Sequence, residues 1–184
     1  MRVLVAYASR HGATAGIAER VAKRLEASGL EVSLVEAARS QSPEGFDAVV
    51  VGGSAYFFHW AKECAAFVRR HADLLRARPT WLFSSGPLGT DRIDAQGRDQ
   101  LETTIPREFP ELTALIAPRG TEVFFGAWDP TQKPSGVMER VSLLMPAVRG
   151  ALPTGDFRDW PAIDAWADGI AAELRLVPAP AGRG

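Results

Sequence analysis

Hydroxyl, glycine and basic residues stand together between Ser9 and Thr14, where an apolar run meets an amphipathic segment. A junction from a strand into a helix points several backbone N–H groups at one spot, and the helix dipole favours an anion there. Gly12 permits close approach of the backbone, and Arg10 adds positive charge. The segment therefore suits a phosphate monoester, with ordinary helix capping by a hydroxyl residue as an equal alternative.

Two further segments carry small and aromatic residues that suit a flat ligand. Residues 52–60 open with a double glycine, which we expect to end a strand and to free backbone amides for close contact. We take Tyr56 as the ring neighbour, whereas Trp60 continues the helical spacing of Cys64 and is expected in the core. Residues 84–89 form a small-residue turn that could offer backbone donors to a polar ring edge.

Strands and helices that alternate along the chain must position these segments. Short apolar runs predict buried strands, and one run with partial alternation predicts a half-exposed strand at a sheet edge. The buried strands are expected at 3–7, 46–51, 80–83 and 122–126, and the edge strand at 32–36. Apolar residues at helical spacing predict helices at about 13–28, 60–74 and 138–148, and after Asp159. Residues 88–118 look irregular, with a short helix around Leu101.

Strands separated by helices predict an α/β fold, a doubly wound five-stranded parallel sheet with helices on both faces. An edge-like second strand suits the order 2-1-3-4-5, in which ligands bind beyond the carboxyl ends of the strands, at the switch point between strands one and three. Loops 8–14, 52–60 and 84–90 all lie there. We expect one domain over residues 1–176 and a loose tail over 177–184.

Composition excludes several classes of protein. The chain has 184 residues, 46% of them hydrophobic and 23% charged, which is ordinary for a globular domain. A net charge of −1 argues against a nucleic-acid binder. The lone cysteine, Cys64, allows no internal disulfide and fits a reducing compartment, and no apolar run is long enough to span a membrane. We therefore expect a cytoplasmic location, and peripheral contact with a membrane stays open.

The three loops together resemble those of the flavodoxin family. The stretch from Val5 to Thr14 is similar to the phosphate loop of that family, in the variant Ser/Thr-x-x-Gly-x-Thr. A closer likeness is to the branch that contains menaquinone-dependent protoporphyrinogen dehydrogenases. It is carried by the turn at 52–54, the helix phrase at 67–71, Phe125-Gly126-Ala127, and Asp159-Trp160 at the start of the last helix.

This resemblance implies that the protein binds FMN. The phosphate would be held by residues 9–14, and the ring system would lie between the second and third loops. The cofactor contacts expected in this way are Ser9, Arg10, His11, Gly12, Ala13, Thr14, Ser54, Ala55, Tyr56, Ser85, Gly86, Pro87 and Leu88. Residues 88–120 and 127–150 would shape the substrate side. Residues 128–136 are less basic than the same stretch of the porphyrinogen branch, which weakens the case for that substrate and for membrane docking.

The resemblance favours an FMN-dependent oxidoreductase that passes electrons between an organic substrate, such as protoporphyrinogen, and a quinone-like acceptor. A flavodoxin-type electron carrier, which would serve a redox partner protein, is the alternative. A charge of −1 does not match the strongly acidic surface of such carriers. A domain that has lost FMN and acts in regulation is a third hypothesis. No nucleophile, triad or metal-ligand set stands out, so we assign no catalytic residue and no metal, and the oligomeric state stays open.

Overall fold

Five parallel strands form the central sheet of the computed structural model, which describes residues 1–39, 42–129 and 153–176. The strand order is β2-β1-β3-β5-β6, so the predicted order 2-1-3-4-5 is confirmed. The edge position predicted for the second strand is also confirmed, because among the described residues β2 pairs with β1 and with no other strand. The sheet strands are β1 (Arg2–Ala8), β2 (Glu31–Glu36), β3 (Ala48–Tyr56), β5 (Thr80–Ser85) and β6 (Gly120–Phe124).

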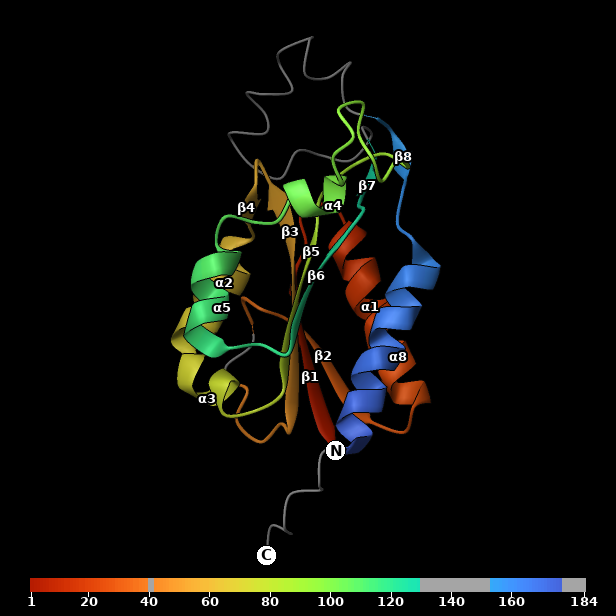
Figure 1. The fold of residues 1–184 in the computed structure, drawn as a ribbon. Coiled ribbons are helices and arrows are strands. Elements are labelled where there is room, and N and C mark those ends of the chain that lie inside the picture. The colour runs from red at the N-terminus through yellow and green to blue at the C-terminus, as the bar shows by residue number, and fades with distance from the viewer. Residues whose placement is uncertain (40–41, 130–152, 177–184) are drawn as a thin grey trace, which may run out of the picture.

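Helices cover both faces of the sheet, as predicted (Figure 1). Side chains alternate along each strand, so Val3 and Val5 pack on one face while Leu4 and Ala6 pack on the other. The first face carries α1 (Ala13–Ala27) and α8 (Trp160–Leu176). The second carries α2 (Lys62–Arg70), α3 (Ala72–Arg76) and α5 (Phe109–Ile116). Beyond the carboxyl ends of the strands lie α4 (Gln100–Thr103), the two-residue strand β4 (His59–Trp60), and the pair β7 (Ala127–Trp128) and β8 (Gly155–Asp156).

The double glycine does not end the third strand, and this corrects the sequence-based prediction. Gly52 and Gly53 lie inside β3, paired with β1 on one side and β5 on the other, so their amides belong to the sheet. A Cβ on Gly52 would lie 1.9 Å from the ring of Phe83, and one on Gly53 would lie 2.6 Å from the indole nitrogen of Trp60. Both glycines are therefore explained by packing of aromatic rings and not by contact with a ligand.

The helix expected over 60–74 divides into three elements. Trp60 is buried, as predicted, but it lies on β4, which pairs antiparallel with the end of β3. The helical spacing suggested otherwise because Trp60 and Cys64 both face the same core cluster. Helix α2 ends before His71, and a second short helix, α3, then places Leu75 in the core.

The segment over 88–118 is less irregular than predicted. The short helix near Leu101 is present as α4, and a second helix, α5, follows. The sequence did not predict α5 because proline disfavours the interior of a helix. Pro110 stands in the first helical turn, where proline is tolerated. The spacing of Phe109, Leu112 and Ile116, which are all buried, was a usable signal for this helix.

Two arginine–aspartate pairs join α1 to α8 along their exposed edge. Arg20 donates two hydrogen bonds of 2.6 Å to Asp164, and Arg24 pairs with Asp168 one turn further on. At the start of α8, Oδ1 of Asp159 accepts a hydrogen bond from the amide of Ala162, so the predicted helix cap is confirmed. The two helices on this face are thus fixed to each other by charge as well as by apolar packing.

No helix in the described ranges is long and apolar enough to cross a membrane. The helix predicted over 138–148 and the tail over 177–184 fall outside the described residues.

Substitution of Gly52 by alanine should destabilise the fold, because the new Cβ would overlap the ring of Phe83 in the middle of the sheet. We expect the free energy of unfolding, measured with urea, to fall by about 1–3 kcal/mol or more. Gly169→Ala is the matched control: nothing lies within 4 Å of a Cβ there, and alanine should stabilise α8 by about 0.5–1 kcal/mol. Equal stability of the two variants would contradict this account of the sheet.

Candidate functional site

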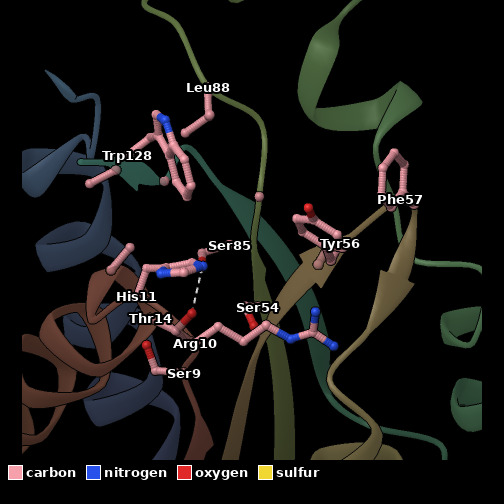
Figure 2. Close-up of a pocket in the computed structure, with 15 residues that line it drawn as sticks. Ser9, Arg10, His11, Thr14, Ser54, Tyr56, Phe57, Ser85, Leu88 and Trp128 are labelled. Carbon is pink, nitrogen blue, oxygen red and sulfur yellow. Dashed lines mark hydrogen bonds between the residues drawn. The ribbon is translucent and has the colours of Figure 1, made fainter. Parts of the chain in front are cut away.

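A cavity of about 270 Å³ opens beyond the carboxyl ends of the central strands, at the predicted switch point (Figure 2). The carboxyl ends of β1, β3 and β5 and the segments that follow them contribute most of its lining, because parallel strands end at the same edge of the sheet. The residues that line it are Ser9, Arg10, His11, Ala13, Thr14, Ser54, Ala55, Tyr56, Phe57, Ser85, Gly86, Leu88, Gly126, Ala127 and Trp128.

The N-terminus of α1 forms one end of the cavity. Gly12 adopts φ +77° at the start of the helix, a left-handed conformation that glycine reaches without steric cost. No side chain caps this helix, and its first turn holds no acidic residue. The alternative that Ser9 or Thr14 merely caps α1 is therefore wrong. The uncapped helix end leaves N–H groups and a positive dipole available to an anion.

Two serine hydroxyls at the cavity lack a protein partner. Oγ of Ser9 and Oγ of Ser54 are buried, and neither has a hydrogen-bond partner among the described residues. A buried hydroxyl that stays unpaired costs about 1–3 kcal/mol, so such groups mark a place where a polar ligand is missing. Their position at the ends of β1 and β3 puts one near the helix terminus and the other farther along the cavity (Figure 2).

Thr14 is engaged differently from what the sequence suggests. Its Oγ1 lies 2.7 Å from Oγ of Ser85, and both residues are almost fully buried. This hydrogen bond joins the first loop to the third across the cavity floor. Only one of the two hydroxyl protons is used between them, so the other remains available to a ligand.

Aromatic side chains form two walls of the cavity. His11 packs edge-on against Trp128 at a centroid distance of 5.1 Å, and Tyr56 meets Phe57 in a similar way at 4.7 Å. Figure 2 shows the two pairs on either side of the space, with the guanidinium of Arg10 near Tyr56. That guanidinium lies 5.1 Å from the centre of the Tyr56 ring. A flat, apolar ring system fits between such walls.

The wall formed by Tyr56 and Phe57 includes an unusual turn. Phe57 and Phe58 connect β3 to β4 with φ values of 49° and 64°. Tight hairpin turns of this hand favour Asn-Gly, because a bulky residue with positive φ is strained by about 1–3 kcal/mol. Phe57 and Phe58 are 64% and 48% exposed, so burial of their own rings does not explain the conformation.

All the residues predicted for the site line the cavity except Gly12 and Pro87. Gly12 shapes the start of α1, and the carbonyl of Pro87 accepts the amide of Gly126 at 2.9 Å. The predicted cofactor contacts leave out Phe57, Gly126, Ala127 and Trp128, although residues 127–150 were expected on the substrate side. The last three follow β6, the neighbour of β5, so the strand order itself was a signal for them.

The described residues provide no metal site and no reactive thiol at the cavity. No group of three or more His, Cys, Asp or Glu residues is arranged to hold a metal ion in this part of the chain. Cys64 is fully buried on α2, away from the cavity lining, and its Sγ donates to the carbonyl of Gly52 at 3.2 Å. Burial raises the pKa of this thiol, so Cys64 stays protonated and inert.

Comparison with curated proteins gives a partial match. Over 86 residues the chain is 30% identical to protoporphyrinogen IX dehydrogenase [quinone] of Escherichia coli. The match covers 46% of this chain and 48% of the relative, so the chain spans about half the length of that protein.

Solved structures share the fold over nearly the whole chain. A flavodoxin from Pseudomonas aeruginosa superposes with a TM-score of 0.58 at 16% identity, covering 95% of this chain and 99% of its own. Flavodoxin 2 from Bacillus cereus gives 0.57 at 18% identity, with 94% and 99% covered. The flavodiiron core Flv1 from Synechocystis gives 0.61 at 12% identity, with 96% and 36% covered. The family model of the flavodoxin domain matches residues 4–132, which is more than half of this chain. The chain therefore belongs to the flavodoxin family.

Proposed function

We propose that the cavity binds FMN, with the phosphate at the N-terminus of α1. The observation that carries this proposal is the uncapped end of α1 beside the unpartnered hydroxyl of Ser9. A phosphate there would accept hydrogen bonds from Ser9 and from the amides of the first helical turn. No carboxylate belongs to the described lining, so nothing in it repels an anion.

The remaining lining residues fit the ring system of the same cofactor. The hydroxyl of Ser54 and the backbone around Gly86 would serve its polar edge, and Tyr56 and Trp128 would flank its faces. Residues 9–14, 54–56 and 85–88 are therefore the binding residues that we propose, with Gly12 and Pro87 acting through the backbone. This set is supported by membership of the flavodoxin family.

We propose further that the protein is an oxidoreductase. FMN accepts and releases one or two electrons, and a flavoprotein supplies the binding and electrostatics that tune this chemistry. Apart from Arg10, the titratable groups of the described lining are His11 and Tyr56. The role that we propose for the chain is to bind and orient the ring and to shield it from water.

The partners of this chemistry are a quinone-like acceptor and an organic substrate of the porphyrinogen type. The support is the printed name of the Escherichia coli relative, which is matched over about half its length. A flavodoxin-type carrier serving a redox protein is the second candidate, since the flavodoxins match this chain from end to end. The nearly neutral net charge weighs against the carrier. A cytoplasmic location fits the single, buried thiol.

The first experiment is a visible absorption spectrum of the protein after FMN is added and the excess removed. We expect a retained and shifted flavin band, and a rise in melting temperature with FMN concentration. The reduced, FMN-loaded protein should then be oxidised rapidly by a menaquinone analogue. No retained flavin and no thermal shift would refute the cofactor. If the protein retains FMN but its reduced form is oxidised only by a redox protein, the result would favour the electron carrier.

Ser9→Ala tests the phosphate end of the site. Because Oγ of Ser9 has no partner among the described residues, its removal should leave the stability of the ligand-free protein unchanged or slightly higher. FMN affinity, measured by flavin fluorescence, should fall by about 1.5–3 kcal/mol, the scale of a hydrogen bond to a charged group. Ser33→Ala on β2, outside the cavity, is the control. Unchanged affinity in Ser9→Ala would move the phosphate elsewhere.

Thr14→Val should behave differently from Ser9→Ala. It leaves the buried hydroxyl of Ser85 without its 2.7 Å partner, so thermal unfolding of the ligand-free protein should occur at lower temperature. FMN affinity should fall as well, by roughly 1.5–3 kcal/mol. Thr14→Ser keeps the hydroxyl and should retain both properties. A valine variant as stable as the wild type would show that the link between the loops contributes nothing.

A further inference from the structure

The turn at Phe57 and Phe58 needs support from outside its own hairpin. Its ladder consists of two residue pairs, Ala55 with Trp60 and Tyr56 with His59. Both turn residues have left-handed backbone conformations that bulky side chains disfavour. A hairpin this short with an unfavourable turn sequence does not hold itself in place.

Glu108, which precedes α5, supplies that support. One carboxylate oxygen lies 2.8 Å from Nδ1 of His59, and the other accepts the backbone amide of Trp60 at 2.9 Å. The adjacent amide of Arg107 donates to the carbonyl of Phe58, also at 2.9 Å. The loop before α5 therefore forms hydrogen bonds with three consecutive residues of the hairpin, 58–60.

The carboxylate is suited to this role. Its side chain is only 19% exposed. Burial alone would raise the pKa of Glu108, but the hydrogen bonds from the Trp60 amide and from His59 outweigh it and the pKa is lowered. Glu108 is thus charged at neutral pH, and hydrogen bonds to a charged acceptor are stronger than those to a neutral one.

This hairpin provides one wall of the cavity. Tyr56 and Phe57 both line the cavity, and Arg10 rests on the ring of Tyr56. Glu108 itself does not line it. Any effect of Glu108 on a bound ring must therefore pass through the backbone and rings of residues 56–60.

We propose that Glu108 is a positioning residue that fixes the turn at Phe57 and Phe58, and with it the wall formed by Tyr56 and Phe57. The consequence for ligand affinity rests on the FMN site proposed above, whereas the hold on the turn does not. Without the carboxylate, the turn relaxes from its left-handed conformation, and the wall loses the position in which a flat ring can pack against it.

Three variants separate positioning from general stability. Glu108→Ala removes both side-chain contacts. Glu108→Gln can keep both, because its oxygen accepts the Trp60 amide while its amide group donates to Nδ1 of His59. Glu111→Ala is the matched control: this glutamate lies on α5 and pairs with Arg69 at 2.7 Å, away from the hairpin.

The first measurement is limited chymotrypsin digestion of the ligand-free proteins, with cleavage after residues 56–58 identified by mass spectrometry. We expect cleavage there to be at least about tenfold faster in Glu108→Ala, as loss of charge-assisted hydrogen bonds would allow. Glu108→Gln should fall between the wild type and Glu108→Ala, because it keeps the two contacts without the charge. Glu111→Ala should match the wild type. Equal cleavage of all four proteins would overturn the proposal, whether or not the protein binds FMN.

The second measurement is FMN affinity, together with a rescue. Glu108→Ala should bind FMN about tenfold more weakly, and adding Phe58→Gly should restore affinity, because glycine adopts the turn without external support. Phe58 does not line the cavity, so the rescue acts through the backbone. Wild-type affinity in Glu108→Ala would refute the link to the site. A wild type that binds no FMN would refute the proposed function alone and leave the digestion to decide on the turn.

Discussion

Two positions without side chains at the centre of β3 allow the sheet and the site to exist together. Gly52 makes room for the ring of Phe83, and Gly53 makes room for the indole of Trp60. Trp60 then donates from Nε1 to the carbonyl of Phe83 at 3.1 Å, so the hairpin is tied to the neighbouring strand. On the opposite face, Phe83 packs with Phe124 and Trp166. The hairpin, the central strands and α8 therefore all depend on space that any larger residue would fill.

The cavity combines polar groups that lack hydrogen-bond partners in the described part of the chain with aromatic walls that are well packed. The polar part contains the uncapped end of α1 and the hydroxyls of Ser9 and Ser54, which have no partner among the described residues and cost stability while no ligand is bound. The walls are aromatic pairs whose rings contact each other in the ligand-free protein. A ligand would thus gain contacts with the polar part without first having to order the walls, which favours affinity.

The sequence predicted the sheet and most of the site because both follow from local patterns and one topological rule. Buried runs such as Val3 to Tyr7 and Val49 to Val51 have no other good interpretation, and parallel order brings their ends together. The hairpin was missed because two phenylalanines with positive φ contradict turn preferences. The turn is held through Trp60 by Glu108, which lies 48 residues beyond Trp60 in the chain. Interactions of that range leave no local trace. Trp128 was left out of the predicted cofactor contacts although the strand order that brings it to the cavity, with β6 beside β5, was predicted correctly.

The contacts between α1 and α8 make the α1 end of the cavity depend on residues that are synthesised long after it. Arg20 and Arg24 pair with aspartates 144 positions later, and Arg158 reaches back to the carbonyl of Ala13 in the first turn of α1. Until α8 leaves the ribosome, the apolar cluster around α1 lacks the part that Ile163, Ala167 and Ile170 supply. During translation the nascent chain therefore carries a nearly complete sheet while the start of α1 still lacks part of its packing, so the cavity is completed late in synthesis.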